Sequence, residues 1–187
     1  MDPQWLADTA DRWWSPVFKG DLKKEGVHRV GDMIRLRDAL VAAGGDSACM
    51  PALEEDLDKI LDRGQFWPGR GAIRMPGERS RCHSNACALW GENQDRDVFV
   101  ATGYALSDDG MWRQHSWALL GTERGMRVVE TTKPRVLYFG FAMTLEETIE
   151  FCDNNLDFPP SVLEETRERY AGLDAAQPAP KRRAARR

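Results

Sequence analysis

The sequence contains no long apolar segment. Nowhere in its 187 residues does an apolar run approach the roughly 18 residues of a membrane-spanning helix. The first residues, MDPQWLADTADRWW, are acidic and lack the apolar core of a signal peptide, which predicts a cytoplasmic protein with no membrane partner.

Cysteines are also few. In the cytoplasm the four of them, Cys49, Cys82, Cys87 and Cys152, stay reduced, so we expect no disulfide framework.

Motifs for metals and phosphates are scarce as well. Zinc needs about four ligands at short, regular spacings, and the sequence has no pair of cysteines separated by two residues. The glycine-rich segment RGQFWPGRG lacks the Gly-Lys-Ser/Thr ending of a phosphate loop. Ala88 stands six residues after Cys82, where a cysteine phosphatase needs Arg. We therefore predict neither a metal nor a cofactor.

Charge is distributed unevenly along the chain. The formal net charge is −4, but the last seven residues, KRRAARR, carry five positive charges, so residues 1–180 carry −9. An acidic body disfavours nucleic acid as a partner, and the basic tail offers only weak phosphate contacts. With 42% hydrophobic and 30% charged residues, the composition is that of a globular protein. We predict a single domain over residues 1–171 and a disordered tail over residues 172–187.

Helical and strand patterns occupy separate parts of the chain. Residues 1–63 place apolar side chains at helical spacing. Residues 64–81 hold four glycines and two prolines, which predicts a loop beside the active site. Residues 82–158 read as a core of one short helix and four strands, and residues 160–171 as a terminal helix. We predict an α+β fold with N-terminal helices followed by a cysteine-bearing helix packed on an antiparallel β-meander.

The boundaries of these elements follow from individual residues. Gly44 and Gly45 end one helix, and the next begins at Pro51 and ends at Gly64. Thr144 and Glu147 form a capping box that opens a helix over residues 145–154. The short helix is expected over residues 84–90, with Gly91 as its end. The four strands are expected at residues 97–107, 111–120, 126–132 and 136–142, with turns at 107–110 and 122–125.

Cys82 lies where the loop meets the start of the short helix. Unpaired backbone N–H groups and the helix dipole at such a position favour the thiolate, which is the nucleophilic form of a thiol. The basic residues Arg79 and Arg81 act in the same direction. Taken alone, Cys82 also fits a small buried residue, because free cysteine is among the most buried residue types.

His115 lies within a strand flanked by aromatic residues, and Glu130 lies on the following strand. With Thr122 and Glu123 at the centre of the turn, His115 faces Glu130. With all of residues 122–125 in the loop, His115 faces Thr132 and Glu130 is its diagonal neighbour. In both registers His115 and Glu130 share one face of the sheet, within about 5–8 Å. A carboxylate at that distance orients an imidazole and stabilises its charged form.

An ordered series of short motifs joins these residues. The series is C-H-S-N-A at 82–86, G-Y-A-L at 103–106, H-S-W at 115–117, V-V-E-T-T at 128–132 and Y-F-G at 138–140. It resembles the papain-like and transglutaminase-like cysteine enzymes, including the NlpC/P60-type branch, over roughly residues 75–141. The resemblance implies that Cys82 is the nucleophile, His115 the base and Glu130 the residue that orients it. Candidates for oxyanion binding or support are His83, Asn85, Gln65 and Gln114.

A thiolate beside an imidazole is suited to attack on an acyl carbon. We therefore predict a thiol hydrolase, amidase, deamidase or acyltransferase with a Cys-His-Glu triad, acting on a peptide-like or protein substrate. One wall of the site is expected to consist of Trp67, Trp112, Trp117 and the loop of residues 64–81. Arg70, Arg74, Arg79 and Arg81 make this wall basic, which favours an acidic substrate. The alternative is a non-catalytic protein-binding module that uses a tryptophan-rich groove on the same fold.

Overall fold

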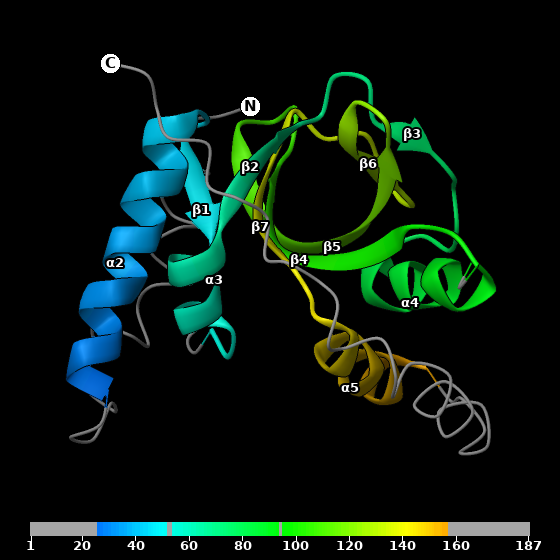
Figure 1. The fold of residues 1–187 in the computed structure, drawn as a ribbon. Coiled ribbons are helices and arrows are strands. Elements are labelled where there is room, and N and C mark those ends of the chain that lie inside the picture. The colour runs from blue at the N-terminus through cyan, green and yellow to red at the C-terminus, as the bar shows by residue number, and fades with distance from the viewer. Residues whose placement is uncertain (1–25, 52–53, 94, 157–187) are drawn as a thin grey trace.

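The computed structural model describes residues 26–51, 54–93 and 95–156 (Figure 1). The predicted helical segment before residue 26, the terminal helix at 160–171 and the basic tail at 172–187 lie outside the described residues. The helices are α2 (Gly26–Ala43), α3 (Leu57–Arg63), α4 (Cys82–Glu92) and α5 (Leu145–Asn155). The strands are β1 (Ser47–Cys49), β2 (Gln65–Pro68), β3 (Ile73–Arg74), β4 (Val98–Leu106), β5 (Met111–Thr122), β6 (Gly125–Glu130) and β7 (Leu137–Ala142). The fold class is α+β, as the sequence predicts.

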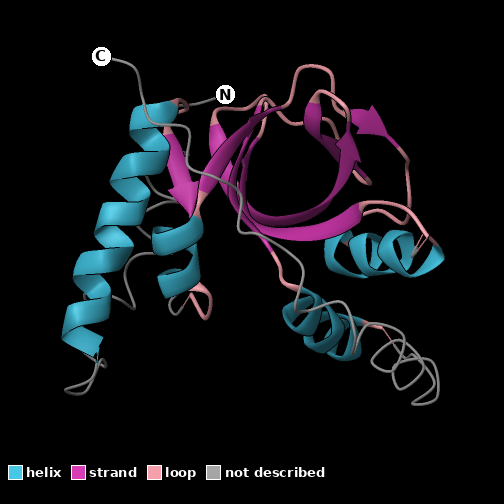
Figure 2. Cartoon of the chain, viewed as in Figure 1, coloured by secondary structure: helices cyan, strands magenta, loops and turns pink. Residues whose placement is uncertain are grey.

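The strands form one curled sheet in the order β2-β7-β4-β5-β6-β3, and β1 pairs in parallel with β5. Figure 2 shows β5 and β6 bending into a ring, with the helices outside it. Strands β4, β5 and β6 are consecutive antiparallel neighbours, but β7 pairs with β4. The predicted meander is therefore wrong in its last step. The curl brings the end of β6 within reach of the far side of the sheet, and the short connection 131–136 returns the chain beside β4.

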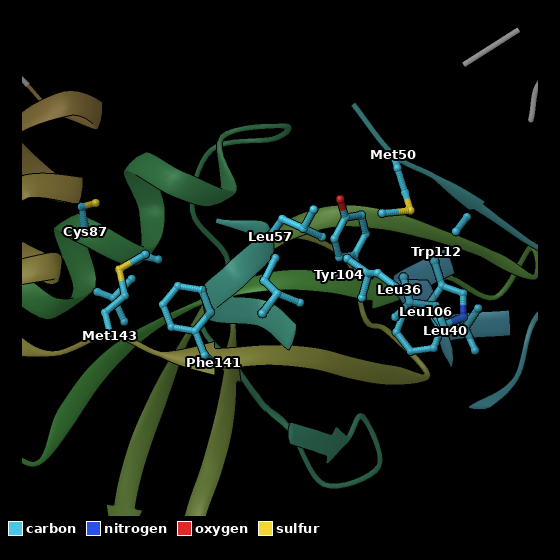
Figure 3. Close-up of a cluster of buried hydrophobic side chains, with 14 of the residues drawn as sticks. Leu36, Leu40, Met50, Leu57, Cys87, Tyr104, Leu106, Trp112, Phe141 and Met143 are labelled. Atoms are coloured by element: carbon cyan, nitrogen blue, oxygen red, sulfur yellow. The ribbon is translucent and has the colours of Figure 1, made fainter. Parts of the chain in front are cut away.

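The two faces of the sheet carry separate sets of buried side chains. The outer face packs against the helices, with Leu36 and Leu40 of α2, Tyr104 of β4, Trp112 of β5 and Phe141 of β7 in one cluster (Figure 3). The inner face of the curl is also apolar. It is filled by Trp67, Ala101, Ala105, Trp117, Leu119, Val128 and Tyr138. Side chains alternate between the faces along β4 and β5, so neighbouring residues of one strand enter different clusters.

Several predicted boundaries are confirmed. Helix α2 ends before Gly44 and Gly45, which have φ angles of 141° and 85°, and Gly64 caps the end of α3. The capping box of Thr144 and Glu147 is formed in full at the start of α5. The cysteine-bearing helix is longer than predicted, since α4 begins at Cys82 itself and passes through Gly91 to Glu92.

Other boundaries need correction. The segment 64–81 is not a continuous loop, because β2 pairs with β7 and β3 pairs with β6. Both are edge strands, which explains how β2 can end in Pro68 without losing a ladder hydrogen bond. Pro51 does not open a helix, and α3 begins only at Leu57. In the part of the chain that the structure describes, no helix combines the length and apolar character needed to cross a membrane.

Candidate active site

Strands β5 and β6 place the histidine and the carboxylate. The hairpin closes with Thr122 opposite Gly125, and the ladder ends with Ala118 opposite Val129. This register is the second of the two predicted alternatives, so Glu130 is a diagonal neighbour of His115. The turn has Glu123 and Arg124 at its centre, one residue later than the first alternative assumed. Both site residues then point into the curl of the sheet.

His115 and Glu130 form a buried pair. His115 Nε2 lies 3.0 Å from Glu130 Oε2, with 2% of the histidine side chain and none of the carboxylate exposed. An ionised carboxylate only accepts hydrogen bonds, so Nε2 carries the proton. The other ring nitrogen, Nδ1, is then the one available to a thiol. Trp117, two residues along the same strand face, stacks beside the imidazole at 6.2 Å between ring centroids.

Three further hydrogen bonds hold the Glu130 carboxylate. The Tyr138 hydroxyl donates to Oε2 at 2.7 Å, and Thr132 donates to Oε1 from its backbone N at 2.6 Å and its hydroxyl at 2.9 Å. Burial acts to raise the pKa of Glu130, but the hydrogen bond and charge of His115 and the bonds from Tyr138 and Thr132 together lower it to about 2. Glu130 is therefore an anion throughout the physiological range.

Tyr138 and Thr132 contact the site, although the sequence motifs alone assign neither a role. Tyr138 lies in the Y-F-G motif and Thr132 in the V-V-E-T-T motif. Strand alternation could have placed Tyr138 on one face of β7. Its contact with Glu130 depends on the curl, which brings β7 opposite the end of β6 although the two strands are not paired.

Cys82 begins α4 and reaches the same histidine. Burial opposes ionisation of its thiol, but the hydrogen bond and charge of His115 lower the pKa of Cys82 below its ordinary value. The backbone N–H groups of Ser116 and His83 act in the same direction. The Ser116 N–H is available because the β5–β6 ladder stops two residues before it. Burial likewise opposes the charged form of His115, yet Cys82 and Glu130 raise its pKa. The three groups thus favour a thiolate–imidazolium pair.

The segment before Cys82 is fixed to both neighbouring elements. Met75 N donates to Glu130 O at 3.0 Å and Gly77 N donates to Thr131 O at 2.8 Å. The Asn85 side chain accepts from Glu78 N at 3.0 Å and donates to Glu78 O at 2.7 Å. Asn85 therefore supports the loop from α4. A Cβ atom at position 77 would lie 2.5 Å from Asn85 Oδ1, so glycine is needed for this close approach.

His83 is held on the outer face of β5. Its Nδ1 lies 2.7 Å from Ser116 Oγ, and its ring meets Phe151 of α5 edge-on at 5.4 Å. Burial, and then the charge of His115, lower the pKa of His83 below its ordinary value. The residue is consequently a neutral imidazole beside the charged pair.

The remaining candidates do not gather at the thiol. Gln114 is on the outer face, where its Nε2 lies 3.3 Å from Glu54 Oε2, and Gln65 is exposed on edge strand β2. Within the described residues, neither contacts Cys82. The exposed Arg79 and Arg81 flank the helix start, and Arg81 pairs with Glu78 at 3.3 Å.

The predicted wall of three tryptophans needs correction. Trp67 and Trp117 pack edge-on at 5.6 Å inside the curl, but both are buried. Trp112 lies on the opposite face of β5, where its Nε1 donates to Gly44 O at 2.7 Å. The odd spacing between Trp112 and Trp117 puts them on opposite sides of one strand.

Comparison with protein-family models, with curated proteins and with solved structures finds no match to this chain. A low-pKa thiol, a buried imidazole with a fixed proton and a permanent carboxylate are the components of a nucleophile with its base.

Proposed function

We propose that Cys82, His115 and Glu130 form the catalytic triad of a thiol enzyme that acts on acyl carbons, related in mechanism to the papain-like and transglutaminase-like enzymes. One observation carries the proposal: a buried imidazole bonded at 3.0 Å to an anionic carboxylate also lowers the pKa of a thiol at a helix start. A purely structural cysteine has no need of this arrangement, because burial alone raises the pKa of a thiol.

The first half of the reaction follows from these groups. The Cys82 thiolate attacks the acyl carbon, the carbon–nitrogen bond of the substrate breaks, and the proton on His115 leaves with the amine. The product is a thioester on Cys82 and a neutral His115. Glu130 keeps its charge throughout and holds the imidazole with Nε2 protonated, so that Nδ1 delivers the proton.

The surroundings favour an acidic, peptide-like or protein substrate. Arg79 and Arg81 are exposed just before Cys82, on a segment held in place by Asn85 and by strand β6. Guanidinium groups pair with carboxylates in a planar, bidentate manner. Replacing both arginines by Gln should weaken the binding of an acidic peptide ester more than that of a neutral one, as seen in KM.

Thiol reactivity gives the direct test. Brief treatment with iodoacetamide, followed by mass mapping, should label Cys82 well before the other three cysteines. Cys87 and Cys152 are fully buried, and burial raises the pKa of Cys49. His115→Ala should slow the labelling of Cys82 near neutral pH without unfolding the protein. Equal labelling of all four cysteines, or protection of Cys82, would contradict the proposal.

Acyl transfer is tested separately. A thioester or nitrophenyl ester probe should leave an acyl adduct on Cys82 in the wild type and none in Cys82→Ala. Fast alkylation without any acyl adduct would favour the alternative, a non-catalytic protein-binding module.

A further inference from the structure

A directed chain of hydrogen bonds links α4 to β5 and β4. Thr102 Oγ1 donates to the backbone carbonyl of His115 at 3.5 Å, and Ser116 Oγ donates to Thr102 Oγ1 at 2.9 Å. Each hydroxyl has a single proton, and a carbonyl oxygen only accepts. The proton of Ser116 Oγ is therefore engaged with Thr102, and this oxygen accepts a hydrogen bond from His83 Nδ1, which lies 2.7 Å away. The chain fixes His83 with its proton on Nδ1.

The consequence is a free lone pair on His83 Nε2. Within the described residues this atom has no hydrogen-bond partner. His83 is half-buried, and its Nε2 is not one of the fully buried side-chain atoms that lack a partner in the described part of the chain. His83 is also neutral, because burial and the charge of His115 lower its pKa.

His83 is adjacent to the proposed nucleophile. It follows Cys82 in the first turn of α4, and its backbone N–H helps to lower the pKa of the Cys82 thiol. His115 is placed differently, since it is almost fully buried and both of its ring nitrogens face protein groups, Glu130 and Cys82. Of the two imidazoles, His83 is the one with a ring nitrogen that no protein group in the described residues occupies.

We propose that His83 is the base that activates the nucleophile, water or an amine, that resolves the acyl-enzyme on Cys82. This inference rests on the proposed function and divides its two half-reactions between two histidines. His115 serves acylation, and His83 serves the step that releases the acyl group.

The step balances with water as the nucleophile. The water oxygen bonds to the thioester carbon, and its proton moves to His83 Nε2. The carbon–sulfur bond then breaks with its electron pair on sulfur, which releases the carboxylic acid and restores the Cys82 thiolate. The proton on His83 passes through solvent to His115, which regenerates the starting thiolate–imidazolium pair. An amine nucleophile follows the same course and gives an amide.

The test uses the full-length protein and p-nitrophenyl acetate. The burst of nitrophenolate reports acylation, and the steady-state rate reports deacylation. His83→Asn keeps an N–H near the position of Nδ1, so the bond to Ser116 is retained, but it has no group in place of Nε2. We expect this variant to keep the burst and to lose at least roughly tenfold in steady-state rate, since general bases contribute about 10²–10⁴. The acetyl adduct should accumulate in intact-mass spectra.

Two supporting measurements separate a base from a structural residue. Hydroxylamine attacks thioesters without a base, so it should restore turnover in His83→Asn. Ser116→Ala keeps the imidazole but removes the acceptor that fixes its tautomer, and it should also slow deacylation while keeping the burst. This second variant carries the test if His83→Asn does not fold.

Three outcomes would overturn the inference. Deacylation at the wild-type rate in His83→Asn, or in Ser116→Ala if the first variant is unfolded, would show that the lone pair on Nε2 is not used. Equal loss of the burst and of the steady-state rate would make His83 a support for the thiolate. A wild-type protein without any burst would remove the proposed function itself, and that result is distinct from the other two.

Discussion

Glu130 is held by donors on every side, and this determines which proton His115 can carry. His115 and Tyr138 point protons at Oε2, and Thr132 points two at Oε1. A carboxylate accepts all four. An amide at the same position places its NH₂ group against the donors on one side. The hydroxyl of Tyr138 can rotate to accept a hydrogen bond, whereas the backbone N–H of Thr132 can only donate. The amide nitrogen therefore comes to face His115.

We predict that Glu130→Gln moves the proton of His115 from Nε2 to Nδ1. Nδ1 can then no longer accept a proton from the thiol, and the anion that raises the pKa of His115 is lost. Alkylation of Cys82 near pH 7 should fall roughly tenfold or more, because each unit of thiol pKa changes the thiolate fraction about tenfold. Wild-type and variant rates should converge above about pH 9, where the thiol ionises unaided.

Tyr138→Phe is the matched control, because it removes one donor to Glu130 and keeps the charge. Its alkylation profile should stay closer to wild type than that of Glu130→Gln. A Glu130→Gln profile that overlays the wild type from pH 6 to 10 (about the range over which both groups titrate) would show that the carboxylate does not control the imidazole.

The positions of Cys82, His115 and Glu130 in the fold were predictable, because each depends only on nearby sequence. Cys82 follows a loop and begins a helix, and His115 and Glu130 lie on two strands of one hairpin, so their meeting depends on a single short turn. Tyr138 reaches Glu130 across the curl, from a strand that is not its neighbour. No periodicity in the sequence carries that information. The prediction that Trp112 shares a wall with Trp117 was wrong for a different reason. Strand alternation alone already places the two side chains on opposite faces of β5.

At the scale of elements, two glycines let the central strands approach one another beside the site. Gly103 of β4 is paired with both His115 and Gly140. It has a φ of 151°, and a Cβ atom there would lie 2.3 Å from Phe139 O. A Cβ atom at Gly140 would lie 2.0 Å from Thr102 O and 2.9 Å from Trp117 Cη2. These strands therefore tolerate no side chain where the sheet curls beneath His115.

We predict opposite effects for two glycine-to-alanine substitutions. Gly140→Ala should destabilise the protein by about 3 kcal/mol or more, because the contact is with backbone and cannot be relieved by a rotamer change. Gly31→Ala should stabilise it by about 0.5–1 kcal/mol, since Gly31 is exposed in α2 and has open space around it. Urea unfolding measures both. A tolerated Gly140→Ala would mean that β4 and β7 can separate locally.

Helices α3 and α5 are joined through one arginine. Arg63 donates to both carboxylate oxygens of Glu147, at 2.8 and 2.9 Å, and to Ala142 O at 2.6 Å. Its guanidinium also lies over the Phe141 ring at 4.7 Å. Glu147 in turn completes the capping box of α5. This arrangement fixes the end of β7 between the two helices.

We predict that Arg63→Lys lowers the free energy of unfolding by about 1 kcal/mol, because an ammonium group cannot make the bidentate contact and reach Ala142 O as well. Arg35→Lys is the control. Arg35 pairs with Asp32 at the surface at 2.8 Å, where such a pair contributes little, so its stability should not change measurably. Equal effects of the two substitutions would show that the Arg63 contact adds nothing to stability.

Elements that are defined within one segment were predictable, and pairings between distant segments were not. Helix α2, the hairpins of β4, β5 and β6, and the cap of α5 follow from local periodicity, turns and capping residues. Strands β2 and β3 are short and lie in a segment rich in glycine and proline. They are extended because they pair with β7 and β6, which their own sequence does not indicate. The return of β7 to β4 is likewise set by closure of the whole sheet.

At the scale of the whole molecule, buried and half-buried carboxyl groups with opposite pKa shifts make the stability depend on pH. Hydrogen bonds and charges of their partners overcome burial and lower the pKa of Glu130 and of Glu147 to about 2. Burial raises the pKa of Glu54, against the hydrogen bond from the Tyr104 hydroxyl. The first two groups stabilise the fold when ionised. Glu54 stabilises it more when protonated.

We predict that the free energy of unfolding falls as the pH drops from about 4.5 toward 2. A group whose pKa is lower in the folded state contributes stability that is present above its unfolded pKa and lost as the pH falls through its folded pKa. For Glu130 this amounts to about 3 kcal/mol. Glu54 has the opposite sign, because its contribution is present below its unfolded pKa and lost as the pH rises. Glu130→Gln should therefore flatten the acid limb of the stability curve below about pH 4.5, as measured by urea unfolding. Glu54→Gln should leave most of that limb unchanged and remove a loss of stability that the wild type shows as the pH rises above about 4.5. Curves for both variants that run parallel to the wild type on both sides of this pH would show that neither carboxyl has a different pKa in the folded and unfolded chains.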